Sequence, residues 1–121
     1  MVWDAARITP EPWASILAFY RHVEERNADF RPLLRLVEHV ISQAYSASIA
    51  SATSGTALLV AQGAQPDWAH DAIRVDVALS GSIRFTFPRK GLAKVATYEC
   101  DGAGIVGAFE SILRKARWIE P

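Results

Sequence analysis

The chain has 121 residues, half of them hydrophobic, and its 13 basic and 13 acidic side chains give a formal net charge of zero. This balance excludes the low hydrophobicity and high net charge of a disordered chain, and the length suits one domain with one core. A single cysteine, Cys100, cannot form an internal disulfide, which disfavours the disulfide-rich small secreted proteins. We expect one domain spanning residues 1–121 in a reducing compartment.

The hydropathy of the sequence indicates neither a secretion signal nor a segment that crosses a membrane. Residues 1–7 contain Asp4 and lack the basic start and apolar run of a secretion signal. No apolar stretch approaches the roughly 20 residues needed to cross a bilayer. We therefore expect a cytoplasmic protein with no membrane association.

Two amphipathic helices are predicted first. Thr9 followed by Pro10 resembles an N-cap with proline at the first helical position, and apolar residues then recur every three or four positions to about Arg26. After a break at residues 27–31, Pro32 can again occupy a first helical turn. The second helix has the wider apolar stripe and is expected to be more buried. That stripe consists of Leu33, Leu36, Val37, Val40, Ile41 and Ala44.

The passage from Ser42 to Ala57 is rich in serine and alanine, and it can be interpreted as a linker or as the continuation of the second helix. Tyr45, Ile49 and Ala52 keep the helical spacing, and Gly55 stands where a left-handed C-terminal cap is common. We favour the helix.

From residue 56 the apolar period changes to two, which predicts strands. The first, Ala57 to Gln62, is apolar throughout, as in a strand that is central or covered on both faces. Two alternating strands, Ile73 to Leu79 and Ile83 to Phe87, are separated by Ser80 and Gly81 and predict a hairpin. A fourth strand is expected over Lys94 to Cys100. Its inward set is expected to be Ala96, Tyr98 and Cys100.

A last helix is predicted from Ile105 to about Trp118. Helices that precede and follow a run of strands, instead of alternating with them, favour an α+β fold. We expect two N-terminal helices, a four-stranded antiparallel sheet and one C-terminal helix. The helices should pack on one sheet face and leave polar side chains on the other.

The segment DGAGIVG, with Gly102, Gly104 and Gly107, matches the G-x-G-x-x-G pattern of dinucleotide-binding loops. That pattern also needs a second parallel strand after the helix, ending in an acidic residue about 20 positions on. Glu120 follows too soon, and the preceding strands are predicted to pair as hairpins. We therefore expect turns at the first two glycines, close helix packing at Gly107 and a cap from Asp101, with no cofactor.

Two sets of residues could support catalysis or metal binding. Cys100 with a histidine could form a nucleophile and base, but no local signature accompanies it. His70 and Asp71 lie in a loop beside Trp68, yet two adjacent ligands fall short of the four that structural zinc requires. We therefore expect Cys100 to be a buried thiol, and we expect His70 and Asp71 to lie in a solvated loop that is anchored by Trp68 and binds no metal.

For the remaining charged residues and the terminal tryptophans, the sequence indicates no catalytic role. Glu24 and Glu25 point about 100° apart on a helix and are expected to be solvated, and His39 should be a hydrogen-bonded boundary histidine. Trp3 and Trp118, near the termini, either pin the ends of the chain or belong to a partner surface.

Basic residues gather along the third strand, the next turn and the fourth strand, and they suggest a single-stranded nucleic-acid module as one alternative. These residues are Arg84, Arg89, Lys90 and Lys94. Phe85 and Phe87 have the opposite parity from Arg84, so they should face the core and leave no stacking platform.

The absence of a clear catalytic set favours a small protein-interaction module, such as an adaptor, an inhibitor or an immunity-like protein, that binds a protein partner or itself. The predicted surface is the polar sheet face with its adjoining turn. It consists of Arg74, Asp76, Arg84, Thr86, Arg89 and Lys90. The competing class is a small-ligand binder or enzyme, with a pocket between the end of the second helix and the sheet that uses Cys100 or His70.

Overall fold

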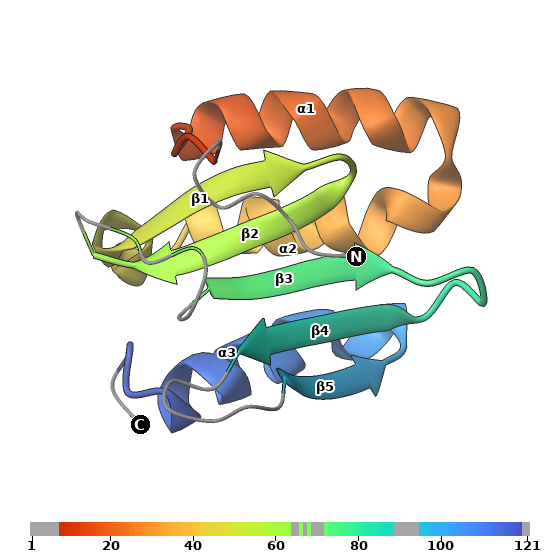
Figure 1. Cartoon of the computed structure of the whole chain (residues 1–121). Helices are drawn as coiled ribbons and strands as arrows, with labels where there is room; N and C mark the ends of the chain where they lie inside the picture. Colours follow the sequence, from red (N-terminus) through yellow and green to blue (C-terminus); the bar gives the residue numbers. More distant parts are fainter. Residues whose placement is uncertain (1–7, 64–65, 67, 69–71, 89–94, 120–121) are drawn as a thin grey trace.

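The computed structural model describes residues 8–63, 66, 68, 72–88 and 95–119 and shows an α+β fold (Figure 1). Three α-helices accompany five strands, and short 3₁₀ turns precede α2, β1 and α3. The helices are α1 (Trp13–Arg26), α2 (Arg31–Ile41) and α3 (Ile105–Lys115). The strands are β1 (Ile49–Ser54), β2 (Ala57–Gln62), β3 (Ala72–Val77), β4 (Ile83–Pro88) and β5 (Val95–Cys100).

The sheet is an antiparallel meander in which each strand pairs with the next along the chain, in the order β1-β2-β3-β4-β5. All three helices lie on one side of it, α2 behind β1 and β2 and α3 behind β4 and β5 (Figure 1). The sheet therefore has a helix-covered inner face and an outer face.

The main core fills the space between the helices and the inner face. Alternate strand residues point inward, as their period of two predicts. The fully buried strand contribution is Leu58, Val60, Val75, Ile83 and Phe85, and the fully buried helix contribution is Ile16, Tyr20, Leu33, Leu36, Val37, Val40, Phe109 and Leu113. The inward parity of Phe85 is confirmed, and so is the predicted stripe of the second helix except at its end, where Ile41 is exposed and Ala44 lies beyond the helix.

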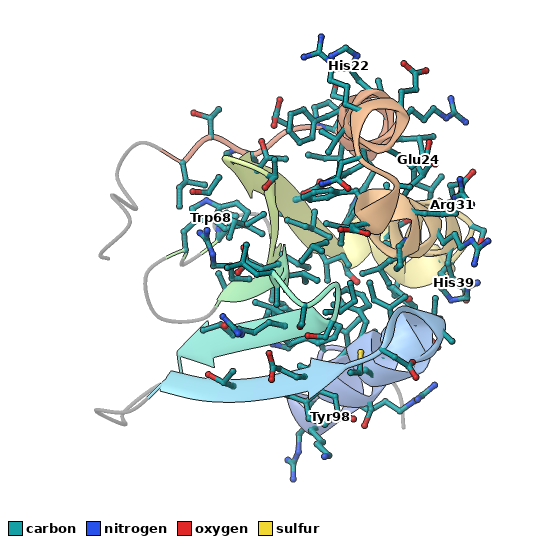
Figure 2. All side chains as sticks on the ribbon, turned by 90° about the vertical axis from the view of Figure 1, so that its right-hand side faces the viewer. His22, Glu24, Arg31, His39, Trp68 and Tyr98 are labelled. Atoms are coloured by element: carbon teal, nitrogen blue, oxygen red, sulfur yellow. The ribbon has the colours of Figure 1, made fainter. Side chains whose placement is uncertain are left out.

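A second, smaller core lies on the outer face over β1 and β2. Trp68 is only 6% exposed and packs with Ala52, Leu59, Ala61 and Ala72. Figure 2 shows Trp68 on the side of the sheet away from the helices. This cluster explains why β2 is apolar from Ala57 to Ala61, because both of its faces are covered there, as predicted.

The β1 edge of the sheet is closed by the segment that leads into α1. Glu11 forms an antiparallel bridge with Ser51, and its carbonyl also accepts a hydrogen bond from the Ser51 hydroxyl at 2.9 Å. The Trp13 indole N–H donates to the Ile49 carbonyl at 3.4 Å, and the Tyr20 hydroxyl donates to the Thr56 carbonyl at 3.0 Å. Burial, with the charge of Asp76 adding to it, raises the pKa of Tyr20, so its hydroxyl stays protonated as a donor.

The predicted helix over Ser42 to Ala57 is wrong, and so is the predicted strand count. The second helix ends at Ile41, a 3₁₀ turn covers Ala44–Ser48, and residues 49–54 form β1. Alternation of small side chains between two buried faces mimicked helical spacing here. Gly55 does adopt a left-handed φ of 60°, but it turns the β1–β2 hairpin instead of capping a helix.

Two further expectations need correction at the helix boundaries. Helix α1 starts at Trp13 with Pro12 before it, and not at Pro10. Glu24 is not simply solvated, because the Arg31 guanidinium donates to its carboxylate at 3.0 Å and joins α1 to α2.

The glycine motif opens α3, and only part of its predicted role is confirmed. Asp101 caps the turn by accepting a hydrogen bond from the Gly104 N–H at 2.9 Å. A Cβ on Gly102 would lie 2.5 Å from Pro32, so the glycine permits close approach of α2. Gly107 would meet nothing within 4 Å, so its predicted packing role is wrong. The strand before the motif belongs to an antiparallel meander, which removes the parallel strand order that a dinucleotide site uses.

None of the helices among the described residues combines the length and apolarity needed to span a membrane.

Candidate functional site

The predicted interaction surface forms a connected patch on the outer face of β3 and β4. Arg74 lies opposite Thr86, and Asp76 lies opposite Arg84, so these four side chains share one face. Arg74 donates to Asp76 at 3.0 Å, and Arg84 donates to Glu99 of β5 at 3.1 Å. The charges of this patch are thus paired with one another. Arg89 and Lys90, which complete the predicted surface, and Lys94 lie outside the described residues.

The nucleophile and base that Cys100 could form with a histidine are not assembled within the described part of the chain. Cys100 is half-buried at the end of β5, and no described histidine hydrogen-bonds to it. Burial, assisted by the charge of Asp101, raises the pKa of the Cys100 thiol, which disfavours the reactive thiolate. His70 and Asp71 lie outside the described residues. The residues that are described contain no group of three or more side chains suited to holding a metal ion.

A cleft of about 780 Å³ lies instead where the chain leaves α2 and where α3 ends. We call it the α2–α3 cleft. Its lining residues are Gln43, Tyr45, Glu110, Arg114, Arg117, Trp118 and Ile119. The alternative considered from the sequence was a pocket between the end of the second helix and the sheet that uses Cys100 or His70. The cleft borders that helix end, yet α3 and its C-terminal turn form the opposing wall.

Glu110 holds the wall of the cleft together. Its Oε2 accepts hydrogen bonds from the Tyr45 hydroxyl at 2.8 Å and from His39 Nε2 at 2.9 Å, while Arg114 lies 3.7 Å from Oε1. Partial burial acts to raise the pKa of Glu110, but the two hydrogen bonds and the nearby positive charges outweigh it and lower that pKa. Glu110 is therefore a carboxylate whose charge is already balanced and hydrogen-bonded by neighbouring side chains of the same chain.

The same hydrogen bonds fix the protonation of the Tyr45 hydroxyl. Burial, followed by the hydrogen bond to Glu110, raises the pKa of Tyr45, so this hydroxyl remains a donor to Glu110. His39, predicted to be a hydrogen-bonded boundary residue, has that role, since it links α2 to α3 through Glu110. Figure 2 shows His39 on the helix side of the molecule.

Helix α3 ends in a two-bond Schellman turn that places Arg117 and Trp118 on the cleft. The Arg117 N–H donates to the Arg114 carbonyl at 3.0 Å, and the Trp118 N–H donates to the Leu113 carbonyl at 2.9 Å. This turn needs a left-handed residue, and Arg117 supplies it with a φ of 63°. Glycine is the usual residue at such a position because it has no Cβ to clash.

Arg117 is exposed and makes no ion pair with any described residue, whereas Arg114 forms an ion pair with Glu110. Trp118 packs its ring against the main core and also lines the cleft. Two guanidinium groups, one satisfied carboxylate and an indole therefore meet in one depression. Such a set can hold an anionic group by charge-assisted hydrogen bonds and a flat ring by stacking.

Sequence reasoning did not assemble this site. Glu110, Arg114 and Arg117 read as the solvated side of an amphipathic helix, and His39 and Tyr45 lie 71 and 65 positions from Glu110. One signal was available: the chain has no glycine after Lys115, where a helix commonly stops on one.

Comparison of the chain with protein-family models, with curated proteins and with solved structures finds no match.

Proposed function

We propose that this chain is a binding protein whose α2–α3 cleft takes a small organic anion with a flat ring, bearing a carboxylate or phosphate. The observation that carries this proposal is Arg117, a cation without a described ionic partner that stands where glycine would fit the backbone better.

The charge of the cleft favours an anion. Glu110 is matched by His39, Tyr45 and Arg114, so the Arg117 guanidinium adds a positive charge that the described residues do not balance. A guanidinium binds carboxylate and phosphate in a bidentate fork, and these bonds are among the stronger hydrogen bonds in proteins.

The apolar part of the cleft favours a ring. Trp118 and Ile119 follow Arg117 directly and also line the depression. Its volume of about 780 Å³ falls within the range of roughly 300 to 1,000 Å³ that small-ligand sites occupy. The Gln43 side chain can add one neutral hydrogen bond from the α2 side.

The backbone strain at Arg117 supports a functional reason for the side chain. A non-glycine residue in the left-handed region costs of order 1 kcal/mol, and such strain is concentrated at binding sites. Arg117 forms no described ion pair that would repay this cost within the fold.

Calorimetric titration with benzoate and benzamide tests the proposal, because the two probes share a ring and differ in charge. Phenyl phosphate tests the same site with the other anion. We expect benzoate or phenyl phosphate to bind at least about tenfold more tightly than benzamide.

Arg117→Ala should weaken binding of the charged probe by about tenfold or more, since it removes one charge-assisted contact. Arg21→Ala is the matched control, because Arg21 is an exposed arginine on α1, away from the cleft. The proposal is wrong if neither anion binds at millimolar concentration, or if the Arg117 and Arg21 variants bind equally.

The interaction module predicted from the sequence remains a second candidate. One observation favours it: Leu79, at the tip of the β3–β4 hairpin whose strands carry the predicted surface, is a large apolar residue left exposed. A pull-down in which Arg84→Ala loses a partner that the wild-type chain retains would support the outer face as its surface.

A further inference from the structure

Strand β5 is the last strand of the described sheet. It pairs with β4 alone, and no other described strand lies on its outer side (Figure 1). An unpaired edge presents backbone N–H and C=O groups that can extend the sheet into another chain. Thr97, Tyr98 and Glu99 are all exposed, so their side chains are accessible to a partner chain.

Tyr98 is the most conspicuous residue of this edge. It lies opposite Phe85 on the inner face, with ring centroids 6.4 Å apart, yet 51% of it is exposed. Figure 2 shows Tyr98 at the outer margin of the sheet, beyond β5. An aromatic ring on an open strand edge is suited to pairing with another chain.

We propose that two copies of this chain pair antiparallel along β5, about a two-fold axis at Tyr98, and join their sheets into one. This inference is independent of the α2–α3 cleft. In an antiparallel pair, residues directly opposite each other share a sheet face, so a two-fold axis must place one residue opposite itself.

The side chains of β5 select the register. With Tyr98 opposite its counterpart, Thr97 of each copy lies opposite Glu99 of the other, and a hydroxyl can donate to each carboxylate. An axis at Glu99 would place two carboxylates together, and an axis at Thr97 would leave Glu99 without that hydroxyl. Arg84 already pairs with Glu99 at 3.1 Å, so the charge entering the interface is balanced within each copy.

Helix α3 would meet its counterpart in such a dimer. Glu110 points toward α2, and Phe109 and Leu113 point into the core. At 100° per residue, Ala108 and Ile112 fall about 160° from Glu110 on either side, so they form the flank of α3 that is turned away from α2. Paired strands lie about 4.8 Å apart, so the α3 helices of two copies would approach each other along this flank, where an alanine and a half-buried isoleucine offer apolar contact.

Sedimentation velocity over about 1 to 200 µM tests the proposal. We expect the wild-type chain to form a dimer within this range. Tyr98→Asp should weaken the dimer at least about tenfold, because it removes the ring pair and sets two like charges opposite each other. Leu79→Asp is the matched control, since Leu79 is fully exposed but lies at the hairpin tip. It should leave the dimer unchanged.

A charge-swap mixture tests the two-fold register itself. Tyr98→Asp mixed with Tyr98→Lys should restore a dimer at least about tenfold tighter than either variant forms alone, because only then do opposite charges meet at the axis. Circular dichroism confirms that each variant is folded. The proposal is overturned if the wild-type chain stays monomeric throughout, if Leu79→Asp dissociates the dimer as Tyr98→Asp does, or if the mixture is no tighter than its components.

Discussion

The two edge strands of the sheet, β1 and β5, differ in how completely other described parts of the chain pair with them and cover them. At the β1 end, Glu11 closes the strand edge, Trp13 is anchored to the strand, and Trp68 covers the outer face. At the β5 end, no described strand pairs with the outer edge, and Tyr98 is half exposed. Groups at the closed end stabilise the fold, whereas groups at the β5 end are available for binding.

The largest expected effect tests the closed end. Trp68→Ala should lower the free energy of unfolding by about 3 to 5 kcal/mol, because it empties the small outer core. Tyr98→Ala, at the β5 end, should change it by less than about 1 kcal/mol at protein concentrations below dimerisation. Urea denaturation measures both. Similar losses for the two variants would remove the contrast between the ends.

A smaller loss of stability is expected from a change at Glu110, which links α3 to α2 beside the cleft. Glu110→Gln keeps the shape of the side chain but replaces charge-assisted hydrogen bonds from His39 and Tyr45 with neutral ones. It should cost about 1 to 2 kcal/mol of stability at neutral pH. Thermal or urea denaturation measures this loss, and Glu25→Gln on exposed α1 surface serves as its control.

The same carboxylate predicts a pH dependence. The pKa of Glu110 is lower in the folded chain than in the unfolded chain, so its contribution is fully present above the ordinary glutamate value of about 4.3. It is lost as the pH falls below that value through the folded pKa. Denaturation of the wild type and of Glu110→Gln between about pH 6 and pH 3 should show the difference between them shrinking toward acid. A constant difference would contradict it.

Ser51→Ala tests the closure of the β1 edge by itself. It removes the hydroxyl that donates to the Glu11 carbonyl at 2.9 Å and should cost about 1 kcal/mol. Thr53→Ala is a suitable control, because its hydroxyl lies 3.5 Å from an exposed Glu11 carboxylate. Equal losses from the two variants would show that the buried hydrogen bond adds nothing.

The smallest effect has the opposite sign. Arg117→Gly should raise the free energy of unfolding by about 0.5 to 1 kcal/mol, since glycine fits the left-handed turn after α3. Under the proposed function, the same variant should lose affinity for benzoate. Chemical denaturation and calorimetry on one preparation measure both. A variant that is destabilised would show that the Arg117 side chain supports the fold.

Local patterns in the sequence determined most of the elements. The apolar stripes of α1, α2 and α3 and the alternation through β3 and β4 each repeat a period that only one backbone geometry can bury on one face. The hairpin around Gly81 and the cap by Asp101 also depend on neighbours in the chain, which is why they could be predicted.

Only the tertiary structure decided the state of the chain from Ile49 to Ser54 and the location of the cleft. Small residues there satisfy helical and strand periods alike, and pairing with β2 together with burial under Trp68 makes them a strand. The cleft joins Glu110 to His39 and Tyr45 across more than 60 positions. Each of these side chains reads as ordinary helix or turn surface in the sequence, because partners so distant leave no local pattern.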